Sequence, residues 1–175
     1  MREEVAILAG GCFWCLQPVF DKLPGVTSTR VGFSGGDLES PSYEAVCSGG
    51  TGHREVVEVR FDPQRLEYGE VLEAFFRSID PTQSDGQFAD KGDHYKTAVF
   101  VFSEQQASVA RDVIEKLNNS GKFNGPIVTE VKPAMQFYAA EEYHQRYYEK
   151  NAGHYEMYAE GSGRKPFLRS LWGEK

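Results

Sequence analysis

The sequence predicts an α+β fold, a two-layer sandwich in which helices cover one face of a mixed, mostly antiparallel sheet. Two observations support this class: strand-like and helix-like segments follow the order β-α-β-β-α-β-α-β-α, and no repeat or second domain interrupts them. The first six elements have the order of a split βαβ, or ferredoxin-like, motif. With 175 residues and 40% hydrophobic residues, the chain is long enough for one domain with its own core.

The individual elements follow from hydrophobic period and from breaker residues. Short apolar or alternating runs predict strands over residues 5–9, 26–33, 53–61, 98–102 and 126–131. Helical spacing predicts a first helix before residue 24 and further helices over residues 68–79, 104–118 and 141–150. Segment 37–52 is expected to be a loop with a helical turn at 43–47, and segment 84–96 a polar loop.

The chain is expected to be one catalytic domain, 1–175, with a core over residues 1–150 and a tail over residues 151–175. Because the tail is rich in glycine, we expect it to be irregular. Its aromatic residues would either cover the rim of a pocket, or the tail would be partly disordered.

Composition limits the possible partners and location. The net charge is −7 and no basic cluster is present, which argues against nucleic acid or an anionic membrane surface. The acidic start and a first apolar run of only five residues fit no signal peptide or membrane span.

Three cysteines cannot form a framework of several disulfides, which favours a reducing, cytoplasmic protein. No heptad pattern appears, so a monomer is expected.

Cys12 lies where the first strand ends and the first helix begins, after the turn Gly10-Gly11. Free N–H groups and the positive end of the helix dipole meet at such a junction. Both favour a thiolate, so Cys12 is predicted to be a nucleophile. Pro18 is costly deep inside a helix, which predicts that regular helix begins closer to Cys15 than to Cys12.

Four further polar residues are candidates for the same site. Glu55 heads a strand, Asp90 and Tyr95 lie in the polar loop, and Tyr43 lies in the Ser/Pro-rich loop. Each of them alone is more typical of a solvated charge, or of a tyrosine at the surface or the edge of the core, than of a functional site.

The segment Gly11-Cys12-Phe13-Trp14 resembles the signature of the A-type peptide methionine sulfoxide reductases. The resemblance continues in order over roughly residues 5–150, through segments 23–26, 32–36, 42–49, 51–55, 80–83, 90–95 and 138–145. It implies thiol-dependent reduction of methionine S-sulfoxide, free or in peptides and proteins, to methionine through a cysteine sulfenic acid.

The resemblance also implies roles for the candidates. Cys12 would attack the sulfoxide sulfur, and Glu55, with a pKa raised by burial, would protonate the sulfoxide oxygen. Tyr43 and Tyr95 would donate hydrogen bonds to that oxygen, and Asp90 would orient water or backbone beside it.

Aromatic neighbours would provide the rest of the site. Phe13 and Trp14 would form an apolar pocket for the S-methyl group and so select the epimer. His53 is expected to be a structural hydrogen-bonding residue rather than a base, and Cys47 a small buried residue rather than a reagent.

The sequence departs from the common family pattern in its recycling cysteines. Many members have glycine where this chain has Cys15 and carry cysteines in the tail, but residues 153–175 contain none. Either Cys15 resolves Cys12 as a Cys-x-x-Cys disulfide that thioredoxin reduces, or an external thiol such as glutaredoxin or glutathione reduces the sulfenic acid directly. No bound cofactor is expected. His94 and Lys96 stand where Gln and Arg are common.

Three other classes compete with this interpretation. Cys12 and Cys15 with Cys47 and His53 offer enough ligands for a zinc site. The Cys-x-x-Cys spacing is also typical of a thioredoxin-like dithiol oxidoreductase. The third is a non-enzymatic binding module with a buried thiol.

Overall fold

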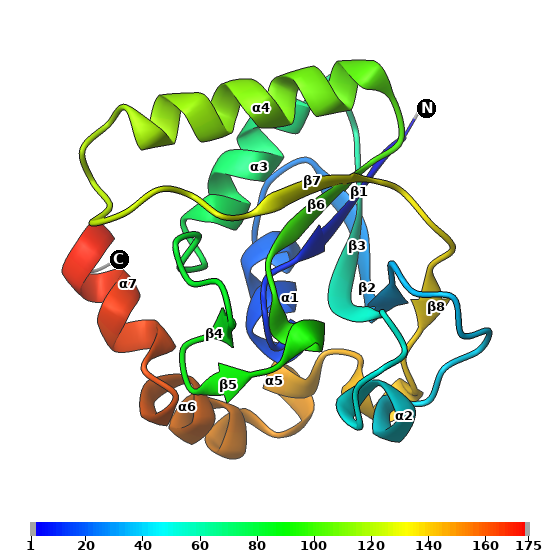
Figure 1. Ribbon diagram of the computed structural model, residues 1–175. Helices are drawn as coiled ribbons and strands as arrows, with labels where there is room; N and C mark the ends of the chain where they lie inside the picture. Colours follow the sequence, from blue (N-terminus) through cyan, green and yellow to red (C-terminus); the bar gives the residue numbers. More distant parts are fainter. Residues whose placement is uncertain (1–2, 174–175) are drawn as a thin grey trace.

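A six-stranded sheet forms the centre of the protein, which a computed structural model describes over residues 3–173 (Figure 1). Its strands are Glu4–Ala9 (β1), Val26–Ser34 (β2), Arg54–Phe61 (β3), Ala98–Val101 (β6), Glu130–Pro133 (β7) and Tyr138–Ala139 (β8). Their order is β7-β6-β1-β3-β2-β8, and neighbours are antiparallel except for the parallel pair β6–β7. The predicted mixed, mostly antiparallel sheet is therefore confirmed.

Two helices complete the split βαβ motif. Phe13–Asp21 (α1) connects β1 to β2, and Tyr68–Phe76 (α3) precedes β6, which gives the central order β6-β1-β3-β2. The longest helix, Glu104–Asn118 (α4), packs along α3 (Figure 1). Within residues 3–173, no helix has the length and hydropathy needed to cross a lipid bilayer.

Strand alternation decides which side chains meet the helices. Ala6 and Leu8 of β1 pack into the helix-covered core, together with Val57 and Val59 of β3. The alternate residues of both strands pack on the opposite face, against the chain that follows β7. Glu55 lies two residues before Val57, so its carboxyl points to the helix-covered side, where α1 begins.

The expectation of an irregular C-terminal tail is wrong. Residues 152–172 contain two helices, Ala152–Gly161 (α6) and Arg164–Trp172 (α7); α6 packs against α1, and α7 packs against α6 (Figure 1). The glycines do not break them, because Gly161 ends α6 and Gly163, at φ 95°, forms the turn between the two helices. Tyr155 and Arg164 are buried and anchor them.

Other boundaries also differ from the sequence-based expectation. The strand expected over 126–131 forms later, as β7, and the helix expected over 68–79 ends at Phe76. The helix expected over 141–150 is split, because Arg146 adopts a left-handed conformation at φ 53°. The remaining elements are Tyr43–Cys47 (α2), Gly86–Gln87 (β4), Asp90–Lys91 (β5), Asp93–Tyr95 (η1), Glu142–His144 (η2) and Tyr147–Lys150 (α5).

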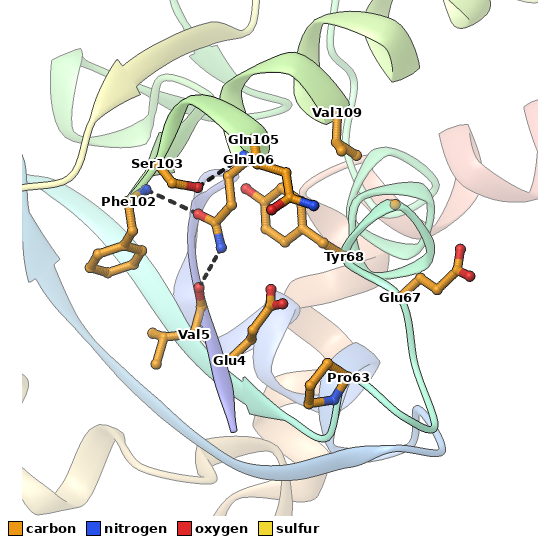
Figure 2. A pocket seen from close by; sticks show the side chains of 11 residues that line it. Glu4, Val5, Pro63, Glu67, Tyr68, Phe102, Ser103, Gln105, Gln106 and Val109 are labelled. Atoms are coloured by element: carbon orange, nitrogen blue, oxygen red, sulfur yellow. Dashed lines mark hydrogen bonds between the residues drawn. The ribbon is translucent and has the colours of Figure 1, made fainter. Parts of the chain in front are cut away.

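A cavity of about 740 Å³ lies between the start of β1, α3 and the start of α4, at the opposite end of β1 from Cys12 (Figure 2). Gln106 closes one side, donating to the Val5 carbonyl at 3.1 Å and accepting from the Phe102 N–H at 3.0 Å. The Tyr68 hydroxyl is buried there without a hydrogen-bond partner among residues 3–173. Because burial and the Glu4 carboxylate raise the pKa of Tyr68, this hydroxyl stays protonated.

This unpartnered hydroxyl gives a stability prediction. Tyr68→Phe is expected to leave the free energy of unfolding unchanged or to raise it by up to about 1 kcal/mol, since no hydrogen bond is lost. The matched Tyr68→Ala variant removes the ring as well and is expected to lower it by about 3–5 kcal/mol. Urea unfolding of the three proteins measures both values, and a clear loss of stability in Tyr68→Phe would contradict the prediction.

Candidate active site

The site begins at the turn that joins β1 to α1. Gly11 has φ +86°, and a Cβ there would come within 2.6 Å of Gln87 and 2.8 Å of Arg164. Cys12 follows as the N-cap of α1, with extended backbone angles of φ −60° and ψ 120°. Regular helix therefore starts at Phe13, directly after Cys12 and earlier than Pro18 led us to expect.

Cys15 is the third residue of α1 and lies beside Cys12. Its N–H donates to the Cys12 carbonyl at 3.1 Å, and both side chains are buried, at 5% and 4% exposure. All three cysteines of the chain are free thiols. The two sulfur atoms of Cys12 and Cys15 share a hydrogen bond.

The acidity of this thiol pair differs from the expectation. Burial, followed by the hydrogen bond to Cys15, raises the pKa of Cys12. The same hydrogen bond lowers the pKa of Cys15 to about 7, helped by the positive charge of Arg164. The Trp14 N–H at the helix start does favour the Cys12 thiolate, but burial outweighs it. These opposite shifts favour a thiolate on Cys15 over one on Cys12.

Glu55 lies directly below the first turn of α1. Its Oε1 accepts the Phe13 N–H at 3.2 Å, while Oε2 is buried without a partner among the described residues. The side chain is 1% exposed, and burial raises the pKa of Glu55 to about 8 although the Phe13 N–H opposes this. The carboxyl is therefore mostly protonated at neutral pH, as the sequence-based argument requires.

Two tyrosine hydroxyls and one carboxylate surround Glu55. Burial and then the charge of Glu55 raise the pKa of both Tyr43 and Tyr95, so both hydroxyls remain hydrogen-bond donors. Tyr95 packs against the buried cluster that contains Cys12 and Cys15. Burial raises the pKa of Asp90, whose Oδ2 accepts a hydrogen bond from Tyr158 of α6.

The two aromatic residues after Cys12 have different environments. Phe13 is fully buried, with its ring 5.7 Å from Phe33 and 5.2 Å from His144 between centroids. Trp14 is half-buried, donates from Nε1 to His144 Nδ1 at 3.0 Å and stacks on Tyr147 at 3.9 Å. Trp14 thus keeps accessible ring surface, whereas Phe13 supports it from the core.

His53 and Cys47 complete the predicted set. His53 Nδ1 accepts from the Gly36 N–H at 3.2 Å and its Nε2 bonds to the Leu38 carbonyl at 2.7 Å, which agrees with a structural role. Cys47 is only half-buried, so the expectation of a buried residue is wrong. It ends the short helix α2, near the protein surface, and its thiol hydrogen bonds to Tyr43.

The C-terminal helices supply Tyr155, one of the tail aromatics expected to pack at the pocket rim, and Arg164, which the sequence analysis missed. Tyr155 of α6 packs in one buried cluster with Cys12 and Cys15. Arg164 of α7 is 4% exposed and donates to the carbonyls of Gly10, at 2.9 Å, and Ser78, at 2.7 Å. No local pattern separates Arg164 from its exposed neighbours, so only the tertiary structure reveals it.

Arg164 gives a second testable prediction. Arg164→Met leaves two buried carbonyls without donors and is expected to lower the free energy of unfolding by about 2–5 kcal/mol. Loss of the positive charge also raises the pKa of Cys15 above about 7. The pH dependence of alkylation at Cys15, followed by mass spectrometry, measures this change. Arg164→Lys keeps the charge and should shift that pKa less; an equal shift in both variants would argue against the electrostatic effect.

The rival zinc ligand set of Cys12, Cys15, Cys47 and His53 does not assemble, because both ring nitrogens of His53 are bonded to backbone groups. Instead, a buried dithiol lies beside a protonated carboxyl and tyrosine hydroxyls at the end of a split βαβ sheet. These features define a thiol-dependent oxidoreductase.

Comparison with known proteins identifies the family. The family model described as peptide methionine sulfoxide reductase matches residues 4–175, and the chain belongs to this family. Peptide methionine sulfoxide reductase MsrA of Bacillus pumilus (strain SAFR-032) is 48% identical over 99% of this chain and 98% of the relative. The protein is therefore an oxidoreductase that reduces methionine sulfoxide, and the classes of thioredoxin-like oxidoreductase and binding module are excluded.

Solved structures agree with this assignment. Reduced Mxr1 from Saccharomyces cerevisiae has a TM-score of 0.81 and 32% identity, covering 86% of this chain and 87% of that one. Methionine sulfoxide reductase A of Corynebacterium diphtheriae has a TM-score of 0.75 and 33% identity, covering 86% and 76%. The α+β fold class is thereby confirmed.

Proposed function

We propose that Cys12 and Glu55 carry out the reduction of methionine S-sulfoxide, free or in peptides and proteins, with Cys15 as the resolving thiol. The buried Glu55 carboxyl is the observation that carries the proposal. One of its oxygens is fixed by the Phe13 N–H, and the other is unpartnered beside the nucleophile. A sulfoxide oxygen that enters the site would meet a proton donor there.

The first step forms a cysteine sulfenic acid. Cys12 passes its proton to the Cys15 thiolate, with which it shares a hydrogen bond, and attacks the sulfoxide sulfur. Glu55 gives its proton to the sulfoxide oxygen, which then moves to Cys12 Sγ: a new sulfur–oxygen bond forms there, while the sulfur–oxygen bond of the substrate and the sulfur–sulfur bond made by the attack both break. Methionine leaves, Cys12 retains the oxygen as S–OH, and Glu55 is left as a carboxylate. One thiol, one thiolate, one carboxylic acid and one sulfoxide are thus converted into one sulfenic acid, one thiol, one carboxylate and one thioether.

Neighbouring groups stabilise and orient the substrate. Tyr43 and Tyr95 donate hydrogen bonds to the sulfoxide oxygen, because their raised pKa values keep both hydroxyls protonated. Asp90 orients water or backbone at the same position. The ring of Trp14, supported by Phe13, contacts the S-methyl group and selects the epimer.

The second step forms a disulfide. The Cys15 thiol attacks Cys12–S–OH, a sulfur–sulfur bond forms, and the proton and hydroxyl leave as water. Two features support this route: the sulfur atoms already hydrogen bond, and Cys12 lies outside the regular helix. A regular helical pair three residues apart would keep its Cβ atoms about 5–6 Å apart, too far for a disulfide.

Thioredoxin is the proposed reductant of this disulfide. Mxr1 of Saccharomyces cerevisiae, a relative of this chain, has been crystallised in complex with Trx2. Direct reduction of Cys12 by glutaredoxin or glutathione is the rival route. We further infer a monomer without a bound cofactor. A location in the reducing cytoplasm is inferred because three cysteines are too few for a disulfide framework.

Steady-state turnover with thioredoxin, thioredoxin reductase and NADPH tests the proposal. Wild-type protein should turn over with this system, and Cys15→Ser should lose nearly all of that turnover. With dithiothreitol or glutathione as reductant, Cys15→Ser should keep activity, because a small thiol can reach the sulfenic acid. If Cys15→Ser turns over normally with thioredoxin, Cys15 is not the resolving thiol.

A further inference from the structure

A second group of potential ligand side chains lies beside the dithiol. Cys47 Sγ, a carboxylate oxygen of Glu55 and a ring nitrogen of His94 all lie within 4.8 Å of one another. They come from α2, β3 and η1, which are far apart in the sequence. The mechanism above uses neither Cys47 nor His94.

We propose that Cys47, Glu55 and His94 form a site for a divalent metal ion of the zinc type, and that occupation of this site inhibits the reductase. Inhibition rests on the proposed role of Glu55, since a carboxylate that binds a metal ion cannot donate a proton. Binding of the metal ion does not depend on that role.

The donor set fits the chemistry of zinc. Thiolate, imidazole and carboxylate are its common ligands, and three protein ligands leave a fourth position for water. With bond lengths of about 2.0–2.3 Å, donor atoms around a tetrahedral ion lie roughly 3.3–3.8 Å apart. Atoms already within 4.8 Å of one another need to approach by only about 1 Å, which side-chain rotation can supply.

A second observation points to a ligand at this place. Glu55 is 1% exposed, and its Oε2 has no partner among residues 3–173, so a buried oxygen is available. Two negative ligands, Cys47 and Glu55, balance the charge of a divalent cation, which reduces the cost of holding it in a buried position. Cys47 is half-buried and gives the ion a path from solvent.

Metal binding is tested first, without any activity assay. Co²⁺ is added to the reduced full chain after removal of the reductant, and the thiolate-to-cobalt absorption band is recorded; Zn²⁺ affinity is measured by competition with a chromophoric chelator. Wild-type protein and Cys15→Ser should show the band. Cys47→Ser should lose it, and His94→Gln should weaken Zn²⁺ binding by at least about 10–100-fold, the effect known for outer-shell changes.

Two outcomes would overturn the site itself. The first is no Co²⁺ or Zn²⁺ binding by the wild-type protein. The second is a band that survives in Cys47→Ser and disappears in Cys15→Ser, which would place the ion on the dithiol instead.

Inhibition is then measured as the Zn²⁺ dependence of single-turnover methionine formation. Wild-type protein should be inhibited over the range in which Zn²⁺ binds, while Cys47→Ser and His94→Gln should need at least about 10–100-fold more Zn²⁺. If Zn²⁺ binds through Cys47 but does not inhibit methionine formation, the metal site is supported and the proposed role of Glu55 as proton donor is contradicted.

Discussion

Substitution of Cys12 by serine is expected to abolish methionine formation, including the first turnover in the absence of any reductant. A serine hydroxyl does not ionise in this buried position and cannot carry the sulfenic acid oxygen, so the rate should fall by at least about 10⁴-fold. Mass spectrometry of the methionine formed from excess sulfoxide measures the loss. The fold should survive, because Cys12 makes no side-chain capping bond to α1.

Matched cysteine variants show whether the effect is specific. Cys47→Ser should retain the wild-type yield, since Cys47 has no step in the mechanism. Cys15→Ser should form one equivalent of methionine, more slowly because Cys12 loses its proton acceptor, and then stop. Methionine formation by Cys12→Ser at a rate near that of the wild-type protein would show that another group is the nucleophile.

Substitution of Glu55 by glutamine is expected to lower the single-turnover rate by about 10²–10⁴-fold, because the sulfoxide oxygen loses its proton donor. Glutamine keeps the shape of the side chain and can still accept the Phe13 N–H, so the loss should be in chemistry rather than in folding. Rapid-quench measurement of methionine formation, alongside thermal unfolding, separates these two effects.

The pH dependence of the single-turnover rate provides a further test that Glu55 is the proton donor. Burial raises the pKa of Glu55 to about 8, so the acid form dominates below that pH and the wild-type rate should fall as pH rises through about 8. The pKa of Cys15 is about 7, so the rate should also fall as pH drops below about 7. Glu55→Gln should lose the alkaline limb and keep the acid limb. An unchanged alkaline limb in Glu55→Gln would assign it to another group.

Much of the fold and of the site follows from local sequence signals. The alternation of β3 predicts a Glu55 side chain on the helix-covered face, and the glycine turn predicts Cys12 at the start of α1. Both signals depend on residues close in sequence. The strand order β6-β1-β3-β2 was predictable because the element order leaves few topologies.

The features that were missed depend on contacts across the molecule. The helices α6 and α7 are anchored by Tyr155, which packs at the dithiol, and by Arg164, which bonds to Gly10; both partners lie at least 140 positions away in sequence. Glycine content predicted an irregular tail because propensity ignores such packing. The acidity of Cys12 was misjudged for the same reason, since burial by α6 is invisible in the local helix-start pattern.

A count of thiols after a single turnover tests the central claim most directly. The reduced protein, freed of reductant, is mixed with excess methionine S-sulfoxide, and free thiols and methionine are both counted. The account predicts one methionine formed and two thiols lost, with Cys12 and Cys15 found in one disulfide-linked peptide. Methionine formed with only one thiol lost would contradict Cys15 as the resolving thiol, and methionine formed with no loss of thiol would contradict cysteine-based reduction itself.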